Sequence, residues 1–135
     1  MRVGFTCGSF DLLHAGHVLM LEECREQCDY LLVGLQTDPT IDRGTQKNKP
    51  VQTVMERWIQ LEAIRHVDAI RAYETEADLL NLLNTEQIDV RFVGPEYRSQ
   101  PFTGQGISEI KVVYNRRRHN YSSSELRRRI IESQS

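Results

Sequence analysis

The sequence predicts an α/β domain built on a parallel β-sheet, and two observations predict it. Short segments rich in apolar residues alternate along the chain with segments whose apolar residues recur at helical spacing. Strands that alternate with helices are joined by right-handed crossovers, which gives a parallel sheet with helices on both faces. The chain has 135 residues, which suits a single domain over 1–135 and is too short for two ordinary ones.

Five segments have the character of strands. The run 30–36 is short and nearly continuous in apolar residues, which is typical of a buried parallel strand. The first strand stands at the start of the chain and is ended by Gly8. The expected strands are 2–7, 30–36, 68–73, 89–94 and 110–114. With helices between them, they predict a Rossmann-like sheet.

Four segments have helical periodicity. In the segment 17–28, the residues Val18, Leu21, Cys24 and Cys28 fall on one face. The other expected helices are 53–65, 75–85 and 123–132. In sheets of this kind, ligands bind beyond the carboxyl ends of the strands, where the strand order reverses. The expected binding loops are therefore those after the first, second, fourth and fifth strands, which are 8–16, 37–50, 94–107 and 115–122.

Composition and charge exclude several classes of protein. Hydrophobic residues make up 39% of the chain and charged residues 27%, which indicates a folded domain rather than a disordered one. No apolar run approaches the roughly 20 residues that cross a bilayer. The N-terminus lacks the layout of a signal peptide, so a cytoplasmic location is expected. The net charge of −2 gives no general reason to expect nucleic-acid binding.

Arginines nevertheless gather near the C-terminus. They are Arg116, Arg117, Arg118, Arg127, Arg128 and Arg129. A basic cluster on a nearly neutral chain indicates a local anionic ligand, with a solvated helix face as the alternative for the last three.

The cysteines predict neither a disulfide framework nor a metal site. Cys7, Cys24 and Cys28 are odd in number, and the chain has no features of a secreted protein. Cys24 and Cys28 share a helix face with core residues, where cysteine behaves as a small apolar side chain. No further Cys or His stands nearby at the spacing of zinc ligands.

The loop after the first strand carries the clearest chemistry. Residues 8–17 read Gly-Ser-Phe-Asp-Leu-Leu-His-Ala-Gly-His. His14 and His17 are three apart, so a helical or turn-like backbone places both imidazoles on one side. Gly16 stands at a helix entrance, where free N–H groups and the helix dipole favour a phosphate. Gly8 lets a ligand approach the backbone. These residues together predict a phosphate-binding loop.

Three better-known loops are excluded. The run lacks the Gly-Lys-Ser/Thr of a Walker A loop and the Gly-x-Gly-x-x-Gly of a dinucleotide-binding turn. It is not a His-Glu-x-x-His zinc motif either.

The run does resemble the H-x-G-H signature of the nucleotidyltransferase family that includes glycerol-3-phosphate cytidylyltransferase and phosphopantetheine adenylyltransferase. The resemblance is closest to glycerol-3-phosphate cytidylyltransferase and extends over nearly the whole chain. Beyond residues 8–17, the matching positions are Thr37-Asp38, Glu56-Arg57, 64–68, 112–114, Arg117 and 122–124. The resemblance implies a nucleotidyltransferase that uses CTP.

The resemblance also implies roles for individual residues. His14 and His17 would hold the phosphates, with Lys47 and Arg117 completing the catalytic set. Nucleotide-binding positions would be Gly8, Ser9, Phe10, Gly16, Lys49, Gly94, Asn120, Tyr121, Ser122, Ser123 and Ser124. The three serines open the last helix, where one of them can serve as a simple N-cap.

A second group is expected to bind the phosphorylated acceptor. Basic side chains there would supply charge for its phosphate, and carboxylates would accept hydrogen bonds from its hydroxyl or amine groups. The expected residues are Asp11, Asp38, Lys47, Arg57 and Arg65.

The implied reaction is in-line attack of an acceptor phosphate oxygen on the α-phosphorus of the nucleotide, with release of pyrophosphate. Such transfer depends on positioning and charge neutralisation rather than on a nucleophilic side chain. Mg²⁺ would come with the triphosphate, with Asp11 as a candidate contact and no permanently bound metal. The resemblance also implies a homodimer.

Two departures from the family pattern keep alternatives open. The family's glycine and isoleucine near the base are Asn120 and Tyr121 here, so an adenylyltransferase that uses ATP is the second hypothesis. A lysine of the glycerol-phosphate enzymes is replaced by the acidic run 74–78, which predicts an acceptor other than glycerol 3-phosphate. A nucleotide-binding module without catalysis is the alternative from another class.

Overall fold

The computed structural model describes residues 1–44, 49–117 and 119–134. Its strands are β1 (Val3–Gly8), β2 (Tyr30–Gln36), β3 (Ala69–Tyr73), β4 (Val90–Val93) and β5 (Lys111–Tyr114). Its helices are α1 (Ala15–Glu26), α2 (Thr40–Arg43), α3 (Val54–Glu62), α4 (Glu76–Thr85) and α5 (Ser123–Ser133), with a 3₁₀ turn, η2 (Pro95–Arg98).

The described strands form one parallel sheet in the order β3-β2-β1-β4-β5. Phe5 of β1 lies between Leu32 of β2 and Arg91 of β4. The chain runs outward from β1 to β3 and then returns to the other side of β1, so the order reverses between β1 and β4. The prediction of a five-stranded parallel α/β sheet is confirmed.

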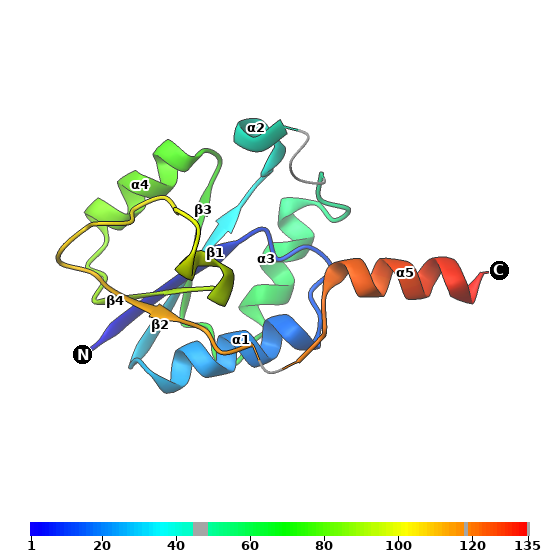
Figure 1. The fold of residues 1–135 in the computed structure, drawn as a ribbon, viewed down its shortest axis with the longest axis horizontal. Coiled ribbons are helices and arrows are strands. Elements are labelled where there is room, and N and C mark those ends of the chain that lie inside the picture. The colour runs from blue at the N-terminus through cyan, green and yellow to red at the C-terminus, as the bar shows by residue number, and fades with distance from the viewer. Residues whose placement is uncertain (45–48, 118, 135) are drawn as a thin grey trace.

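Helices cover both faces of this sheet (Figure 1). On one face, Leu21 and Cys24 of α1 and Leu61 of α3 pack with Leu31 and Val33 of β2. On the other face, the helix α4 packs against the alternate residues of β1 and β2, and this second cluster contains Phe5, Leu32, Leu79 and Leu83. The alternation of β2 between the two clusters explains why its sequence is apolar throughout.

The boundaries of most elements agree with the sequence to within about three residues. β2 has the predicted bounds, whereas α1 begins two residues early and α3 ends at Glu62. The loops 37–50 and 94–107 hold two elements that were not predicted, α2 and η2. No helix within the described ranges combines the length and apolar character that spanning a membrane requires.

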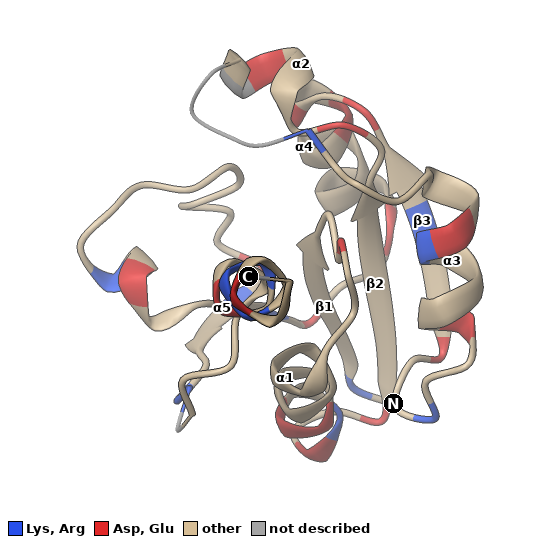
Figure 2. Cartoon of the chain, turned by 90° about the vertical axis from the view of Figure 1, so that its right-hand side faces the viewer, with Lys and Arg blue, Asp and Glu red and all other residues tan. Residues whose placement is uncertain are grey.

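The helix α5 projects from the body of the molecule, and its C-terminal end lies away from the sheet (Figure 1). Both signs of charge line its surface (Figure 2), and Arg128 forms ion pairs with Glu125 and Glu132 along the helix. Arg129 also pairs with Glu125. For these two arginines the alternative of a solvated helix face is therefore confirmed.

Candidate active site

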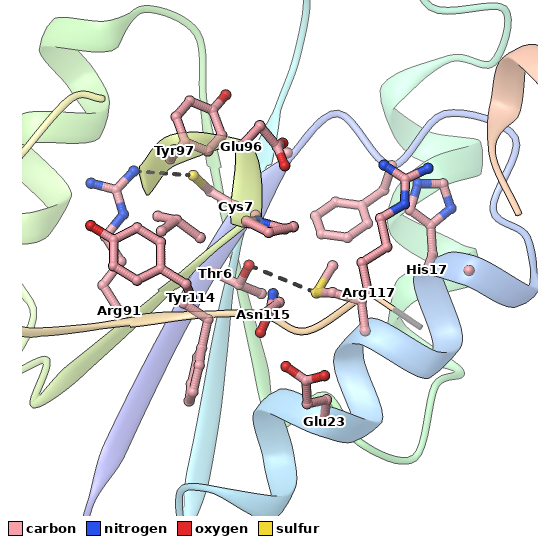
Figure 3. A pocket seen from close by; sticks show the side chains of 18 of the residues that line it. Thr6, Cys7, His17, Glu23, Arg91, Glu96, Tyr97, Tyr114, Asn115 and Arg117 are labelled. Atoms are coloured by element: carbon pink, nitrogen blue, oxygen red, sulfur yellow. Dashed lines mark hydrogen bonds between the residues drawn. The ribbon is translucent and has the colours of Figure 1, made fainter. Parts of the chain in front are cut away.

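A cleft of about 1180 Å³ lies along the carboxyl ends of β1, β4 and β5. It therefore opens at the point where the strand order reverses, as expected for this kind of sheet. Figure 3 shows residues from both halves of the sheet around it, among them Thr6 and Cys7 of β1, Arg91 of β4 and His17 of α1. The buried Asn115, which follows β5, also lines it.

His14 and His17 lie at the end of the cleft formed by the start of α1. The backbone N–H of His14 donates to Nδ1 of His17 over 3.2 Å, and the backbone N–H of Gly16 donates to Nδ1 of His14 over 3.0 Å. The two ring centroids are 4.0 Å apart. The histidines therefore cap α1, which explains why the helix begins earlier than its apolar period suggests.

This capping arrangement fixes the tautomer of both rings. Because each Nδ1 accepts a backbone N–H, the proton of a neutral imidazole resides on Nε2. Burial lowers the pKa of His17 to about 4, with His14 adding to the effect and Asp11 opposing it. Burial also lowers the pKa of His14, together with the charges of His119 and Arg117. At neutral pH each ring is thus an Nε2–H donor suited to a phosphoryl oxygen.

A third histidine, which the sequence analysis did not select, lies against the same turn. A Cβ placed on Gly16 would come within 2.8 Å of Cε1 of His14 and 2.9 Å of Cε1 of His119. Gly16 is therefore needed for the close packing of these rings on the helix. Nδ1 of His119 accepts the backbone N–H of Tyr121, and the two rings stack at 5.2 Å.

The segment before α5 brings further predicted residues to the cleft. Arg117, Tyr121, Ser122 and Ser123 line it. Ser122 is the N-cap of α5 and accepts the N–H of Glu125. The expectation that one serine serves as a simple N-cap is thus met at Ser122.

Several predicted nucleotide contacts fall on the same cleft, and some do not. Gly8, Ser9, Phe10 and Gly94 line it together with the residues above. Lys49, Asn120 and Ser124 are exposed and do not line it. Lys47 lies outside the described residues.

Asp11 requires a correction, because its carboxylate is used by the protein itself. Oδ1 accepts the N–H of Gln52 over 2.9 Å, and Oδ2 accepts the N–H of Val51 over 2.8 Å. Arg127 forms an ion pair with Oδ2 at 3.1 Å. Asp11 is also buried. Asp11 therefore links the loop after β1 to residues 51–52 and to the helix α5, and its carboxylate does not face an acceptor or a magnesium ion.

Arg57 also has a structural role instead of the expected contact with an acceptor. It is only 2% exposed. Nη1 donates to the carbonyls of Ser9 and Gln36, and Nη2 donates to that of Thr37. Nε donates to the carbonyls of Gln52 and Thr53. Arg57 thus satisfies backbone groups at the ends of β1 and β2, and it directs these donors to the protein itself.

Arg65 and Asp38 complete the predicted acceptor set, and neither lines the cleft. Arg65 is exposed and precedes β3, so it lies at the amino ends of the strands, whereas the cleft lies at their carboxyl ends. Asp38 follows β2 and accepts the N–H and hydroxyl of Thr40 at the start of α2. These hydrogen bonds lower the pKa of Asp38.

The described residues offer little to a resident metal ion. No group of three His, Cys, Asp or Glu side chains within the described ranges is placed to hold one. Asp11, the candidate contact, has its oxygens occupied as given above. No catalytic step is therefore assigned to a protein-bound metal.

The geometry is thus that of a loop and helix entrance that present paired N–H donors beside a cleft at the switch point of a parallel sheet. The model of the family described as cytidylyltransferase-like matches residues 5–129. The chain belongs to the cytidylyltransferase-like family. Membership makes this chain a nucleotidyltransferase, in keeping with the arrangement of its histidines.

Similar proteins extend the comparison. The chain is 38% identical over 109 residues to the bifunctional protein HldE of Gluconacetobacter diazotrophicus. The aligned region covers 79% of this chain and 22% of that protein. The corresponding protein of Acidiphilium cryptum is 39% identical over 103 residues, with 76% and 21% covered. The chain therefore spans about a fifth of the length of these relatives.

Among solved structures, the fold is similar to that of the lipopolysaccharide core biosynthesis protein from Thermoplasma volcanium GSS1. The TM-score is 0.72 at 23% identity, with 88% of this chain and 99% of that chain covered. At this identity the likeness supports the fold, and it agrees with the Rossmann-like sheet described above.

Proposed function

We propose that this nucleotidyltransferase transfers CMP from CTP to a small phosphorylated acceptor, a polyol phosphate or a similar phosphomonoester, and releases pyrophosphate. The observation that carries the proposal is the pair of neutral imidazoles on the first turn of α1, with both Nδ1 atoms occupied by backbone N–H groups. This leaves two Nε2–H donors for phosphoryl oxygens that gain charge in the transition state.

Other residues at the end of the cleft that holds His14 and His17 support the same chemistry. Arg117 adds a cation close enough to lower the pKa of His14. Its backbone has a φ of 35°, in the left-handed region that residues with side chains rarely adopt. The N-terminus of α5 supplies free N–H groups for a polyphosphate. Donors from two helix starts and a guanidinium position the triphosphate for in-line attack, which needs no covalent intermediate on the protein.

ATP is the second candidate nucleotide. The residues that differ from the family pattern include Tyr121, which lines the cleft and stacks on His119. This aromatic pair offers a flat surface that accepts a purine as readily as a pyrimidine. Mg²⁺ would enter with either triphosphate as part of the substrate.

We expect an acceptor other than glycerol 3-phosphate to be the best one. The acidic run 74–78 opens α4, and Glu76 from it lines the cleft. A carboxylate in place of a lysine removes a charge-assisted contact to phosphate, which is worth roughly 1.5–3 kcal/mol. That difference corresponds to about a ten- to hundredfold change in preference.

The experiment is a matrix of two nucleotides and a panel of acceptors, with pyrophosphate release as the signal. CTP and ATP are each tested with glycerol 3-phosphate, sugar phosphates, polyol phosphates and amino-alcohol phosphates. CTP turnover with a polyol or sugar phosphate is the expected result. Faster turnover with ATP would show that ATP, not CTP, is the nucleotide substrate. If glycerol 3-phosphate were the best acceptor by tenfold, the proposal of a different acceptor would be wrong. Nucleotide binding without pyrophosphate release from any pair would contradict catalysis altogether.

A further inference from the structure

The cleft has a second end, on the face of the sheet that α4 covers. Phe5 of β1 pairs with Leu32 of β2 and with Arg91 of β4, and side chains alternate along each strand, so Cys7 and Arg91 lie on the same face as Phe5 and Leu32. Gln36 lies opposite Tyr73 in the register of β2 and β3 and points to the same face. All four of the polar residues Cys7, Gln36, Tyr73 and Arg91 line the cleft.

Arg91 is a buried cation with an unused donor. Only 4% of the residue is exposed. Nη1 donates to the carbonyl of Thr103, Nη2 contacts the sulfur of Cys7 at 3.8 Å (Figure 3), and the guanidinium lies 5.0 Å from the ring centre of Phe102. Nε is buried and has no hydrogen-bond partner. None of the ion pairs among the described residues involves Arg91.

Gln36 repeats this feature on the neighbouring strand. It is 6% exposed, and its Nε2 is also buried without a hydrogen-bond partner. Its backbone carbonyl is held by Arg57, which fixes the end of β2. Buried polar groups are almost always hydrogen-bonded, because an unmade bond costs free energy. Two such donors at one end of a cleft indicate that a ligand supplies the missing acceptors.

The other groups at this end identify the kind of ligand. Glu76 lines the cleft, and its charge acts on Tyr73. Burial above all, with Cys7 and Glu76 adding to it, raises the pKa of Tyr73, so its hydroxyl stays neutral and can donate or accept. A phosphate would meet the Glu76 carboxylate unfavourably. A hydroxyl group both donates and accepts, and therefore suits such a mixture.

We propose that this end of the cleft binds the hydroxyl-bearing part of the acceptor, so that the acceptor is a polyol or sugar phosphate, with Gln36 and Arg91 as the residues that determine specificity. The inference rests on the proposed transfer to a phosphorylated acceptor and adds the part of the acceptor that is recognised. The phosphate of that acceptor is then directed toward the histidine end, where the nucleotide is attacked.

The test compares two phosphomonoesters of equal charge, ribitol 5-phosphate and ethyl phosphate, in Gln36→Leu and Arg91→Lys. Each substitution removes one unpaired donor while roughly preserving size or charge. The matched controls are Gln60→Leu on α3 and Arg71→Lys on β3, since neither residue lines the cleft. Circular dichroism and thermal unfolding verify the fold of each variant, and two variants on different strands guard against a local folding defect.

In the variants, kcat/KM for ribitol 5-phosphate is expected to fall at least about tenfold, through KM, because a site built for hydroxyl groups loses a donor. The values for ethyl phosphate and the KM of the nucleotide stay within about twofold, and the controls resemble the wild type. Equal losses with both phosphomonoesters, a raised KM for the nucleotide, or unchanged kinetics in both folded variants would overturn the subsite.

Calorimetry separates this inference from the proposed reaction. Ribitol 5-phosphate is titrated into the protein in the presence of the α,β-methylene analogue of CTP. If no acceptor is turned over but binding is detected and is at least about tenfold weaker in Gln36→Leu, the proposed function fails while the subsite holds. If the wild type binds ribitol 5-phosphate no more tightly than ethyl phosphate, the subsite is wrong whatever the enzyme transfers.

Discussion

The side chains of His14 and His17 together form the N-terminal cap of α1, and this leaves each imidazole with one free nitrogen, Nε2. Nδ1 of His17 accepts from the backbone of His14, while Nδ1 of His14 accepts from the backbone of Gly16 two residues on. The same hydrogen bonds that start α1 thus orient the groups that face the cleft. Structural and chemical roles can be separated by substitutions that keep one nitrogen position and remove the other.

We expect His17→Asn to fold normally and to lose turnover by about 100-fold or more. The asparagine oxygen can replace Nδ1 as the acceptor of the His14 N–H, whereas no group replaces Nε2. Losing a donor to developing charge typically costs roughly 100- to 1000-fold in rate. His14→Ala and His17→Ala should lose at least as much, with some loss of stability from the missing cap. Near-wild-type kcat at saturating substrate in a folded variant would assign that histidine to structure alone.

Stability should depend on pH through His17. The pKa is about 4 in the folded protein and near 6.5 in the unfolded chain, so the unfolded chain binds more protons between these values. The contribution to stability is complete above pH 6.5 and is lost as the pH falls to 4, by about 1–3 kcal/mol. Urea unfolding at several pH values measures it, and His17→Asn should flatten the curve in this window. An identical slope in the variant would contradict the depressed pKa.

Adding one methyl group at Gly16 should impair catalysis without unfolding the helix. In Gly16→Ala the new Cβ would come within 2.8 Å of the His14 ring, so the imidazole must move. Alanine favours the helix by about 1 kcal/mol over glycine, which offsets part of the strain. We expect kcat/KM to fall about tenfold or more with a thermal midpoint close to that of the wild type. Unchanged kinetics would mean that the rings adapt without losing their alignment.

Arg57 and Arg65 allow the contribution of a buried arginine to stability to be compared with that of an exposed one. Arg57→Met leaves several carbonyls at the ends of β1 and β2 without their donor and should cost about 3–5 kcal/mol of unfolding free energy. Arg65→Met removes an exposed side chain at the amino ends of the strands and should change stability by less than about 0.5 kcal/mol. Denaturant unfolding measures both. A stable Arg57→Met that fails only to bind acceptor would restore the sequence-based interpretation.

The homodimer implied by the family resemblance remains a prediction. Exposed apolar residues such as Ile59 on α3 and Ile131 on α5 provide surface that self-association could bury. Light scattering coupled to size exclusion at micromolar concentration should give twice the chain mass of 15.7 kDa. A mass of one chain across that range would reject the dimer.

Local sequence patterns were sufficient for the strands, because buried parallel strands such as β2 are apolar throughout. They also located His14 and His17, whose spacing and flanking glycine act within one turn. The structural roles of Asp11 and Arg57 could not be predicted, because Asp11 binds the backbone of Val51, 40 residues away, and Arg57 binds carbonyls of Ser9, Gln36 and Thr37, which are 20 to 48 residues away. A charged side chain is expected to be exposed unless such partners are known.

Arg91 had a visible signal that went unused. It interrupts the apolar run of the fourth strand, where a cation can persist only if the fold supplies partners or a ligand does. His119 was missed for a different reason. It stands in a segment that departs from the family pattern, and only the folded chain brings it against Gly16.

The position of Asp11 couples two segments of the chain that lie far apart in the sequence. Its carboxylate holds the N–H groups of Val51 and Gln52 together with Arg127 of α5, and its backbone carbonyl accepts the hydroxyl of Ser123. One residue therefore ties the start of α5 to the segment that follows Lys49. A triphosphate that tightens the first turn of α5 would restrain that segment as well, so nucleotide binding would slow hydrogen exchange at the N–H groups of Val51 and Gln52.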